Sequence, residues 1–234
     1  MLLESFREVD QWMILLSRKG VRDLMFTNSD QCYTLPCYMF SCLELTKLKL
    51  HNCFFKPPLE FEGFLNLELL ALSNSNFGAN LCGTQINLPQ LKNLQLITCT
   101  NVYNFNIKAT KLQFFGVFNC PDAMFLRLFK SPCLTQVSMH FYKPIEENVR
   151  VEKMTLAMML SNLPKIEHLL VGSLFFKVLI VEKIPKWLPH AVNSLKRLSL
   201  LKFQFGDLDQ LQGALCLLRN APNLESLFVT CLEM

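Results

Sequence analysis

The chain has 234 residues, of which 51% are hydrophobic and 18% are charged, a composition that supports a substantial core and excludes a disordered chain. The net charge of only +4 is spread along the sequence without blocks of like charge, which argues against binding to nucleic acid or to a membrane surface. No apolar run approaches the ~20 residues that span a bilayer, and the acidic, amphipathic N-terminus does not look like a signal peptide, so we expect an intracellular protein, cytoplasmic or nuclear.

The first predicted element is an amphipathic helix over residues 3–19. Phe6, Val9, Met13 and Leu16 recur at the spacing of one helical face. We assign residues 1–20 to this N-terminal helix, which would cap the first strand or belong to a repeat whose strand is missing, and residues 21–234 to the domain that follows.

From residue 21 onward one pattern recurs: an apolar residue, any two residues, a second apolar residue, any one residue, and a third apolar residue. It occurs nine times, and the first positions of successive matches are 21 to 32 residues apart. The matches are Val21-Leu24-Phe26, Leu45-Leu48-Leu50, Leu67-Leu70-Leu72, Leu91-Leu94-Leu96, Leu112-Phe115-Val117, Leu134-Val137-Met139, Ile166-Leu169-Val171, Leu195-Leu198-Leu200 and Leu224-Leu227-Val229.

This period and spacing are typical of leucine-rich repeats. The last two apolar residues of each match would lie on the inner side of a short strand, and stacked coils would bury them together because one coil cannot cover its own apolar side. The pattern therefore predicts an α/β leucine-rich-repeat solenoid of about nine repeats, truncated at the C-terminus. A curved parallel β-sheet would form the concave side, with short irregular turns on the convex side of the early repeats and helices on that of the later ones.

The position eight residues after the first apolar residue is small in the early repeats. Ser29, Cys53, Ser75, Cys99 and Cys120 occupy it, and we expect them to turn inward and bond the neighbouring backbone. The later repeats have large residues there, so their turns should be built differently; these are Tyr142, Leu174, Phe203 and Leu232.

The ten cysteines are expected to act mainly as small buried hydrophobes. Disulfides are not expected, because the N-terminus does not look like a signal peptide, the chain has no N-x-S/T sequon and it is large enough to fold without them. A zinc site is not expected, because the chain contains no C-x-x-C pair.

The segments between the predicted strands differ along the chain. Residues 54–66 contain Pro57-Pro58 and Gly63, which favour an irregular or short 3₁₀ connection. Residues 151–162 and 207–220 are expected to be helices, the second with Asp207 as its N-cap. The predicted core-facing stripe of this second helix consists of Leu208, Leu211, Leu215 and Leu218.

Several segments resemble plant F-box/leucine-rich-repeat proteins of the FBD-containing type. They are "VDQWMILLSRKGVRDLMF" (9–26), "YTLPCYMFSCLELTKLKLHNCFFKPP" (33–58), "LPQLKNLQLITC" (88–99) and "FGDLDQLQGALCLLRNAPNLESL" (205–227). The resemblance implies that an F-box binds a Skp-type adaptor of a cullin–RING ubiquitin ligase and that the repeats recruit the protein to be ubiquitinated. Only eight residues precede Val9, too few for an F-box, so adaptor binding is carried over to no residue here and is expected only of a longer product.

Residues that alternate with the buried strand positions should face the concave side and form the surface that binds a partner. Phe114 and Phe118, on either side of Gly116, are predicted to stand exposed as anchors for that partner. Histidines on this side are expected to be solvated, because His51 would lie roughly 19 Å from His140 and so could not share a metal site with it. The full set of candidate partner-binding residues is Lys47, Lys49, His51, Gln95, Phe114, Phe118, Gln136, His140, His168 and Arg197.

The sequence contains no glycine-rich phosphate loop, G-x-S-x-G or H-E-x-x-H motif, so we assign no catalytic, cofactor-binding or metal-binding residue and expect no enzyme. The main hypothesis is a solenoid that binds an unidentified target protein, as the substrate-recognition region of an F-box-type ubiquitin ligase receptor. The alternatives are a stand-alone scaffold or truncated gene product without a ligase role, and, from another class, an enzyme or small-molecule sensor. The last strand, near 224–229, is expected to leave an exposed apolar end that promotes self-association.

Overall fold

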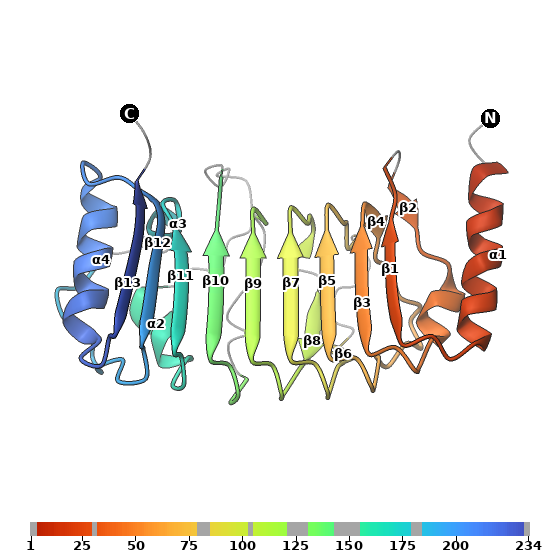
Figure 1. The fold of residues 1–234 in the computed structure, drawn as a ribbon, viewed down its shortest axis with the longest axis horizontal. Helices are drawn as coiled ribbons and strands as arrows, with labels where there is room; N and C mark the ends of the chain where they lie inside the picture. The colour runs from red at the N-terminus through yellow and green to blue at the C-terminus, as the bar shows by residue number, and fades with distance from the viewer. Residues whose placement is uncertain are drawn as a thin grey trace. The chain divides into compact units, whose positions relative to one another are not determined.

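The structure is a computed structural model that describes residues 4–29, 32–78, 85–102, 105–120, 131–142, 155–178 and 184–231. The chain divides into two compact units, Met1–Leu112 and Gln113–Met234, which are called unit 1 and unit 2 below. In both units the strands of the main sheet run parallel, as the repeat pattern predicts (Figure 1).

Unit 1 begins with helix α1 (Glu4–Arg18) and continues into a parallel sheet. Its strands are β1 (Asp23–Thr27), β3 (Lys47–His51), β5 (Leu69–Ser73) and β7 (Asn93–Ile97). Leu24, Leu48, Leu70 and Leu94 are partners across this sheet, so the second apolar residue of each repeat lies in one row. Short additional ladders join β2 (Tyr33–Thr34) to β4 (Cys53–Phe54), and β6 (Gln85–Asn87) to β8 (Asn106–Lys108).

Unit 2 has the same arrangement with helices in its connections. Its strands are β9 (Phe114–Phe118), β10 (Gln136–His140), β11 (His168–Gly172), β12 (Arg197–Phe203) and β13 (Ser226–Cys231). Its helices are α2 (Leu156–Ser161), α3 (Phe175–Val178) and α4 (Leu208–Asn220), and α2 lies behind the sheet in Figure 1. The predicted α/β leucine-rich-repeat fold is confirmed in each unit, with a strand at every one of the nine matches.

The core of unit 1 combines rows of leucine with a cluster of phenylalanines. Phe55, Phe77 and Phe105 lie with ring centroids 4.6 to 5.9 Å apart, a spacing at which aromatic pairs attract. Gly63 has a φ of 139°, and a methyl group added to it would overlap the backbone of Asn87. The early connections are thus irregular, as expected, and the only helical turn described between β1 and β9 is the 3₁₀ segment η1 (Cys37–Ser41).

The inward turn after the strands is confirmed for most early repeats. Cys53, Cys99 and Cys120 are fully buried, and each thiol donates a hydrogen bond to the carbonyl two residues earlier, with sulfur–oxygen distances of 3.4 to 3.5 Å. Ser75 does the same with its hydroxyl at 2.9 Å, whereas Ser29 is exposed. The preceding residue is left-handed in these turns, with φ between 47° and 57° at the following positions: Asn52, Asn74, Thr98 and Asn119.

The large residues at the same position in unit 2 have different environments. Phe203 is buried behind Lys202, whose φ is 53°, while Tyr142 is exposed. Leu174 is half-buried at the start of the turn into α3, and Leu232 lies outside the described residues. The positions before Tyr142 and Leu174 lack a left-handed residue, as expected for differently built turns, whereas the turn before Phe203 keeps the left-handed residue of the early repeats, so there the prediction is wrong.

Helix α4 begins as predicted but packs on another face. The carboxylate of Asp207 accepts hydrogen bonds from the backbone amides of Asp209 and Gln210. The predicted stripe is wrong, because Leu208 is 70% exposed while the buried positions are Gln210, Gly213, Ala214, Cys216, Leu217 and Asn220. The reason is steric: a methyl group added to Gly213 would overlap the ring of Phe176, so the small residues set the face that approaches α3.

The other two predicted helices are also present. In α1 Met13 is buried, and Tyr33 of β2 donates a hydrogen bond to the Asp10 carboxylate at 2.5 Å, which ties the helix to that strand. The Phe6 side chain lies outside the described residues. Helix α2 is capped by Thr155, whose hydroxyl accepts from the Met158 amide at 3.1 Å, and residues 151–154 of the predicted helix lie outside the described part. The boundary between cap and repeat domain at residue 20 stays a prediction.

Candidate partner-binding surface

The side chains that point away from the core on the main sheet strands are called the sheet face below. The burial patterns alternate along the strands, for instance in β3, where Leu48 and Leu50 are buried and Lys47 and Lys49 are exposed. The inward and outward positions of the strands therefore agree with the predicted register. The binding role of the outward residues is not tested by this agreement and stays a prediction.

In unit 1 the candidate residues form a polar surface with local partners. The Lys47 ammonium lies 3.6 Å from the Asp23 carboxylate, in an exposed ion pair that contributes little to folding. His51 Nδ1 lies 2.9 Å from the Ser73 hydroxyl, which itself donates to the Leu50 carbonyl, so the imidazole is held in place. Gln95 donates to the side chain of Asn93 at 3.1 Å.

Phe114 and Phe118 in unit 2 are half-buried rather than fully exposed as predicted. Their rings lean over Gly116: a methyl group added there would lie 2.9 Å from the first ring and 3.2 Å from the second. The absence of a side chain at Gly116 provides the space that both rings occupy. Part of each ring remains accessible on the sheet face.

Gln136, His168 and Arg197 lie side by side at the amino ends of three adjacent strands. The register pairs the first with the second and the second with the third. Gln136 and Arg197 are exposed and His168 is half-buried. These three positions therefore give one accessible polar row on the sheet face of unit 2.

His140 differs from its predicted solvated state, because it is only 4% exposed. Its ring lies over Gly172, where an added methyl group would be 2.6 Å from Cδ2, and it packs against the Tyr142 ring in a tilted arrangement with centroids 4.5 Å apart. Nε2 is buried without a hydrogen-bond partner among the described residues. Burial lowers the pKa of His140, and the nearby Lys202 ammonium lowers it further.

Tyr142 and Lys202 are surface residues that the sequence analysis did not select. The Lys202 Nζ lies 4.7 Å from the centre of the Tyr142 ring, a cation–π contact. The lysine on β12 thus contacts Tyr142, which itself packs against the His140 ring. For His140 the signal that was missed is the glycine at position 172, which leaves room for the imidazole ring.

The last described strand presents apolar side chains to solvent. Leu227 occupies the position that Leu198 fills in the preceding strand, yet it is 47% exposed whereas Leu198 is fully buried. Phe228 on the sheet face is 54% exposed. The exposed apolar end predicted near 224–229 is confirmed, and self-association through it stays a prediction.

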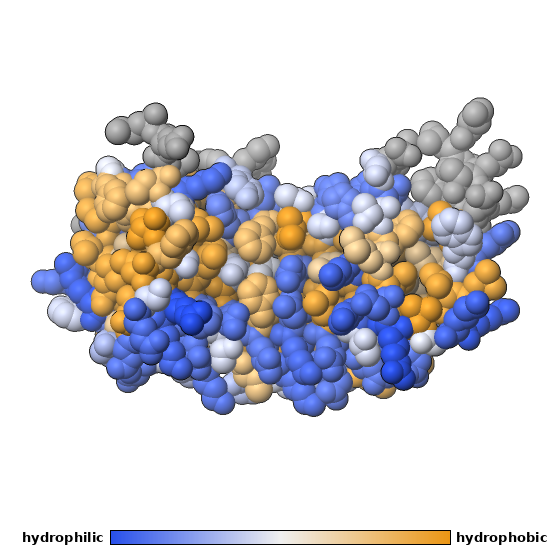
Figure 2. All heavy atoms as spheres, viewed as in Figure 1, coloured by the Kyte–Doolittle hydropathy of each residue, from blue (hydrophilic) through white to orange (hydrophobic). Residues whose placement is uncertain are grey.

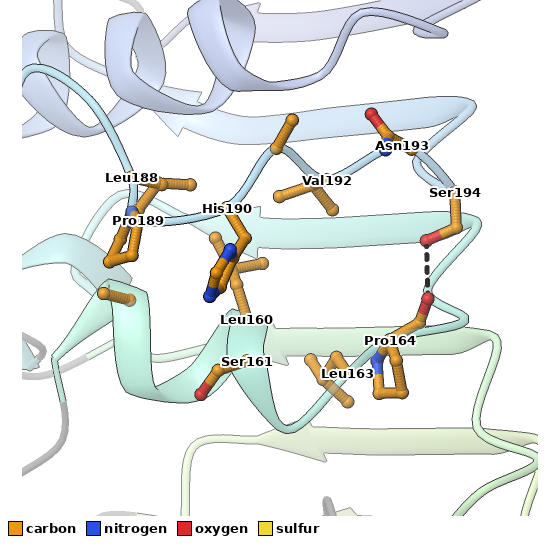
Figure 3. A pocket seen from close by; sticks show the side chains of 12 residues that line it. Leu160, Ser161, Leu163, Pro164, Leu188, Pro189, His190, Val192, Asn193 and Ser194 are labelled. Carbon is orange, nitrogen blue, oxygen red and sulfur yellow. Dashed lines mark hydrogen bonds between the residues drawn. The ribbon is translucent and has the colours of Figure 1, made fainter.

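The other side of unit 2 contains a shallow groove of about 320 Å³ between α2 and residues 188–194 (Figure 3). Leu160, Leu163, Pro189 and Val192 give it a mostly apolar lining, and Ser194 closes one end by donating to the Pro164 carbonyl at 3.2 Å. Its volume is near the lower limit for small-molecule sites. None of the residues that line the groove is a buried charged residue that could orient a ligand.

Over the described ranges, no three His, Cys, Asp or Glu side chains are placed to share a metal ion. Within the same part of the chain, no helix has the length and apolar character needed to cross a bilayer.

Comparison with known proteins agrees with the repeat architecture. The family described as FBD-associated F-box protein At5g56370, LRR repeats, matches residues 9–229, which is nearly the whole chain. The chain belongs to this family. The F-box/FBD/LRR-repeat protein At1g13570 of Arabidopsis thaliana is 29% identical over 225 residues, covering 95% of this FBD-associated leucine-rich-repeat chain.

The FBD-associated leucine-rich-repeat chain spans 54% of the length of that Arabidopsis relative. The match therefore concerns the repeat region, and activities of the whole relative are not transferred by it. No solved structure matches the chain. The earlier resemblance to plant F-box/FBD/leucine-rich-repeat proteins is confirmed.

Proposed function

We propose that the sheet face is a recognition surface for another protein, and that the chain is the substrate-recognition region of an F-box-type ubiquitin ligase receptor. The proposed recognition surface is supported by the alternation of buried and accessible side chains along the strands of each unit. One set of side chains fills the core, and the other leaves polar and aromatic groups accessible in rows. Such extended surfaces are what repeat proteins use to bind partners.

The proposed role in a ubiquitin ligase receptor is supported by membership in a family named for F-box proteins. An F-box in a longer product would connect the repeats to a Skp-type adaptor, and no residue of this chain is assigned to adaptor binding. The binding region would then select the protein to be ubiquitinated. The alternative is a stand-alone leucine-rich-repeat scaffold that binds a protein without a ligase role.

The experiment is quantitative affinity purification of the full-length gene product from plant cells, in wild-type form and as two double variants. Lys49→Glu with Arg197→Glu reverses charge on the sheet faces, whereas Lys56→Glu with Lys186→Glu reverses two exposed charges outside the main sheet strands. We expect a set of proteins that is lost in the first variant and kept in the second. Equal recovery from all three forms would contradict the recognition role.

The same purification separates the ligase role from the scaffold. Co-purification of a Skp-type adaptor with both variants would support a receptor whose adaptor contact lies away from the sheet face. If partners are recovered and the adaptor is missing, the scaffold alternative is favoured and the ligase role is rejected.

A further inference from the structure

The sheet face of unit 2 has an uneven charge distribution. Strands β9 to β13 contain Arg197 and Lys202 but no Asp or Glu. The Arg197 guanidinium forms no ion pair with any described residue. The Lys202 ammonium faces the Tyr142 ring rather than a carboxylate. Both cations therefore lack a neutralising group of their own on this face.

Apolar side chains lie between and beside the two cations. Leu170, Ser199 and Phe228 are partners across β11, β12 and β13, and Leu201 is outward on β12 beside Gly172. The leucines are half-buried and Phe228 is exposed. Figure 2 shows the apolar atoms gathered over these strands and the hydrophilic atoms along their amino ends. An accessible apolar patch with cations at its margins is a common design for a protein-binding surface.

The spacing of the charges suits an extended segment. Arg197 and Lys202 lie five residues apart on β12, at most about 16 Å at roughly 3.3 Å per residue. An extended chain of similar length would place a carboxylate at each end and apolar side chains between them. His140 stays buried behind Tyr142 and adds no accessible charge.

We propose that this cationic–apolar face, formed by Leu170, Arg197, Leu201, Lys202 and Phe228, binds an extended acidic segment of the partner protein that also carries apolar side chains. The inference rests on the proposed function and specifies the chemistry of the partner. Paired opposite charges at the margins would set orientation and speed of association, while the apolar contacts would provide most of the affinity. A nucleic acid fits less well, because its phosphates would find only two cations and its backbone would leave the apolar residues uncovered.

The test is selection of peptides from a random display library on the immobilised full chain. The bound peptides should be enriched in Asp and Glu together with Leu, Ile and Phe. A fluorescein-labelled selected peptide is then titrated by fluorescence anisotropy. Its Kd should rise by about tenfold or more in Arg197→Glu with Lys202→Glu, and should also rise with added salt.

Two controls keep the result specific. Lys56→Glu with Lys186→Glu makes the same total charge change outside the main sheet strands and should leave the Kd within about twofold of wild type. Arg197→Gln with Lys202→Gln removes the cations without introducing carboxylates and should give an intermediate Kd. Thermal unfolding of all variants checks that the exposed substitutions leave the fold intact.

The outcomes distinguish this inference from the proposed function. Basic or neutral peptides, a Kd insensitive to Arg197→Glu with Lys202→Glu, or no binder from the library would each overturn the acidic-segment inference. Partner loss from Lys49→Glu with Arg197→Glu in cells would still support protein recognition. Tighter binding of a single-stranded oligonucleotide than of any peptide, abolished by the same charge reversal, would assign the face to nucleic acid and contradict both.

Discussion

Substituting Gly213 by alanine separates helix propensity from packing in α4. Alanine is favoured over glycine in a helix interior by about 1 kcal/mol, so propensity alone predicts a more stable protein. The added methyl group would, however, overlap the ring of Phe176 and lie 2.8 Å from its Cγ. Because Phe176 is fully buried, the ring has little room to move, and overpacking of this kind costs about 1–3 kcal/mol.

The expected net effect is a loss of about 0–2 kcal/mol in the free energy of unfolding. Urea denaturation of Gly213→Ala measures it, and Gln212→Ala at the exposed neighbouring position is the matched control, expected to be neutral or slightly stabilising. Combining Gly213→Ala with Phe176→Leu should cost less than the sum of the two single changes, because the smaller side chain relieves the overlap. A Gly213→Ala protein more stable than wild type would refute the close packing of α4 on α3.

Three further predictions concern other parts of the chain. Leu94→Ala should lower the free energy of unfolding by about 2–5 kcal/mol, whereas Gln95→Ala should change it by less than about 0.5 kcal/mol, and equal losses in chemical denaturation would mean that the strand register is wrong. Asp207→Ala should cost about 0.5–2 kcal/mol by removing the two N-cap hydrogen bonds, and Asp207→Asn should recover most of it in thermal melts. Because the folded protein lowers the pKa of His140, stability should be full above the unfolded value of about 6.5 and should fall as the pH drops below it, by up to about 1.4 kcal/mol per pH unit. His140→Gln should flatten that dependence in melts at a series of pH values, and an unchanged slope would exclude a buried neutral imidazole.

Strand positions were predictable because the repeat imposes two periodicities at once. A residue such as Leu48 must satisfy the alternation within its strand and the match to Leu70 in the next coil. Few sequences meet both conditions by chance, so nine matches located every strand of the main sheets. The turn cysteines were predictable for the same reason, since Cys53, Cys99 and Cys120 keep a fixed distance from the strand.

The errors came from places where shape outweighed hydrophobicity. The leucines of α4 suggested one buried face, but Gly213 and Ala214 allow the opposite face to approach Phe176 more closely. His140 was expected in solvent because its position faces outward, and the missing side chain at Gly172 leaves room for its ring to become buried. Both outcomes depend on a neighbour on another element, which a pattern along one segment does not contain.

The minor ladders were missed for a related reason. Strands β2, β4, β6 and β8 have two or three residues each, too few for any alternation to be recognised. The candidate binding residues could be predicted as outward-facing positions, because facing direction follows from alternation. Tyr142 and Lys202 were not selected, since their contact depends on the left-handed turn at Lys202.

Hydroxyl-radical footprinting of the free chain tests the central claim most directly, namely that one side of the strands fills the core while the other is open to a partner. Met25 in β1 is 71% exposed and Met139 in β10 is fully buried. We predict rapid oxidation of Met25 and Phe228, with Met139 and Phe115 protected until the protein unfolds. Similar oxidation rates at the outward and inward positions would contradict the alternation and the binding surface built on it.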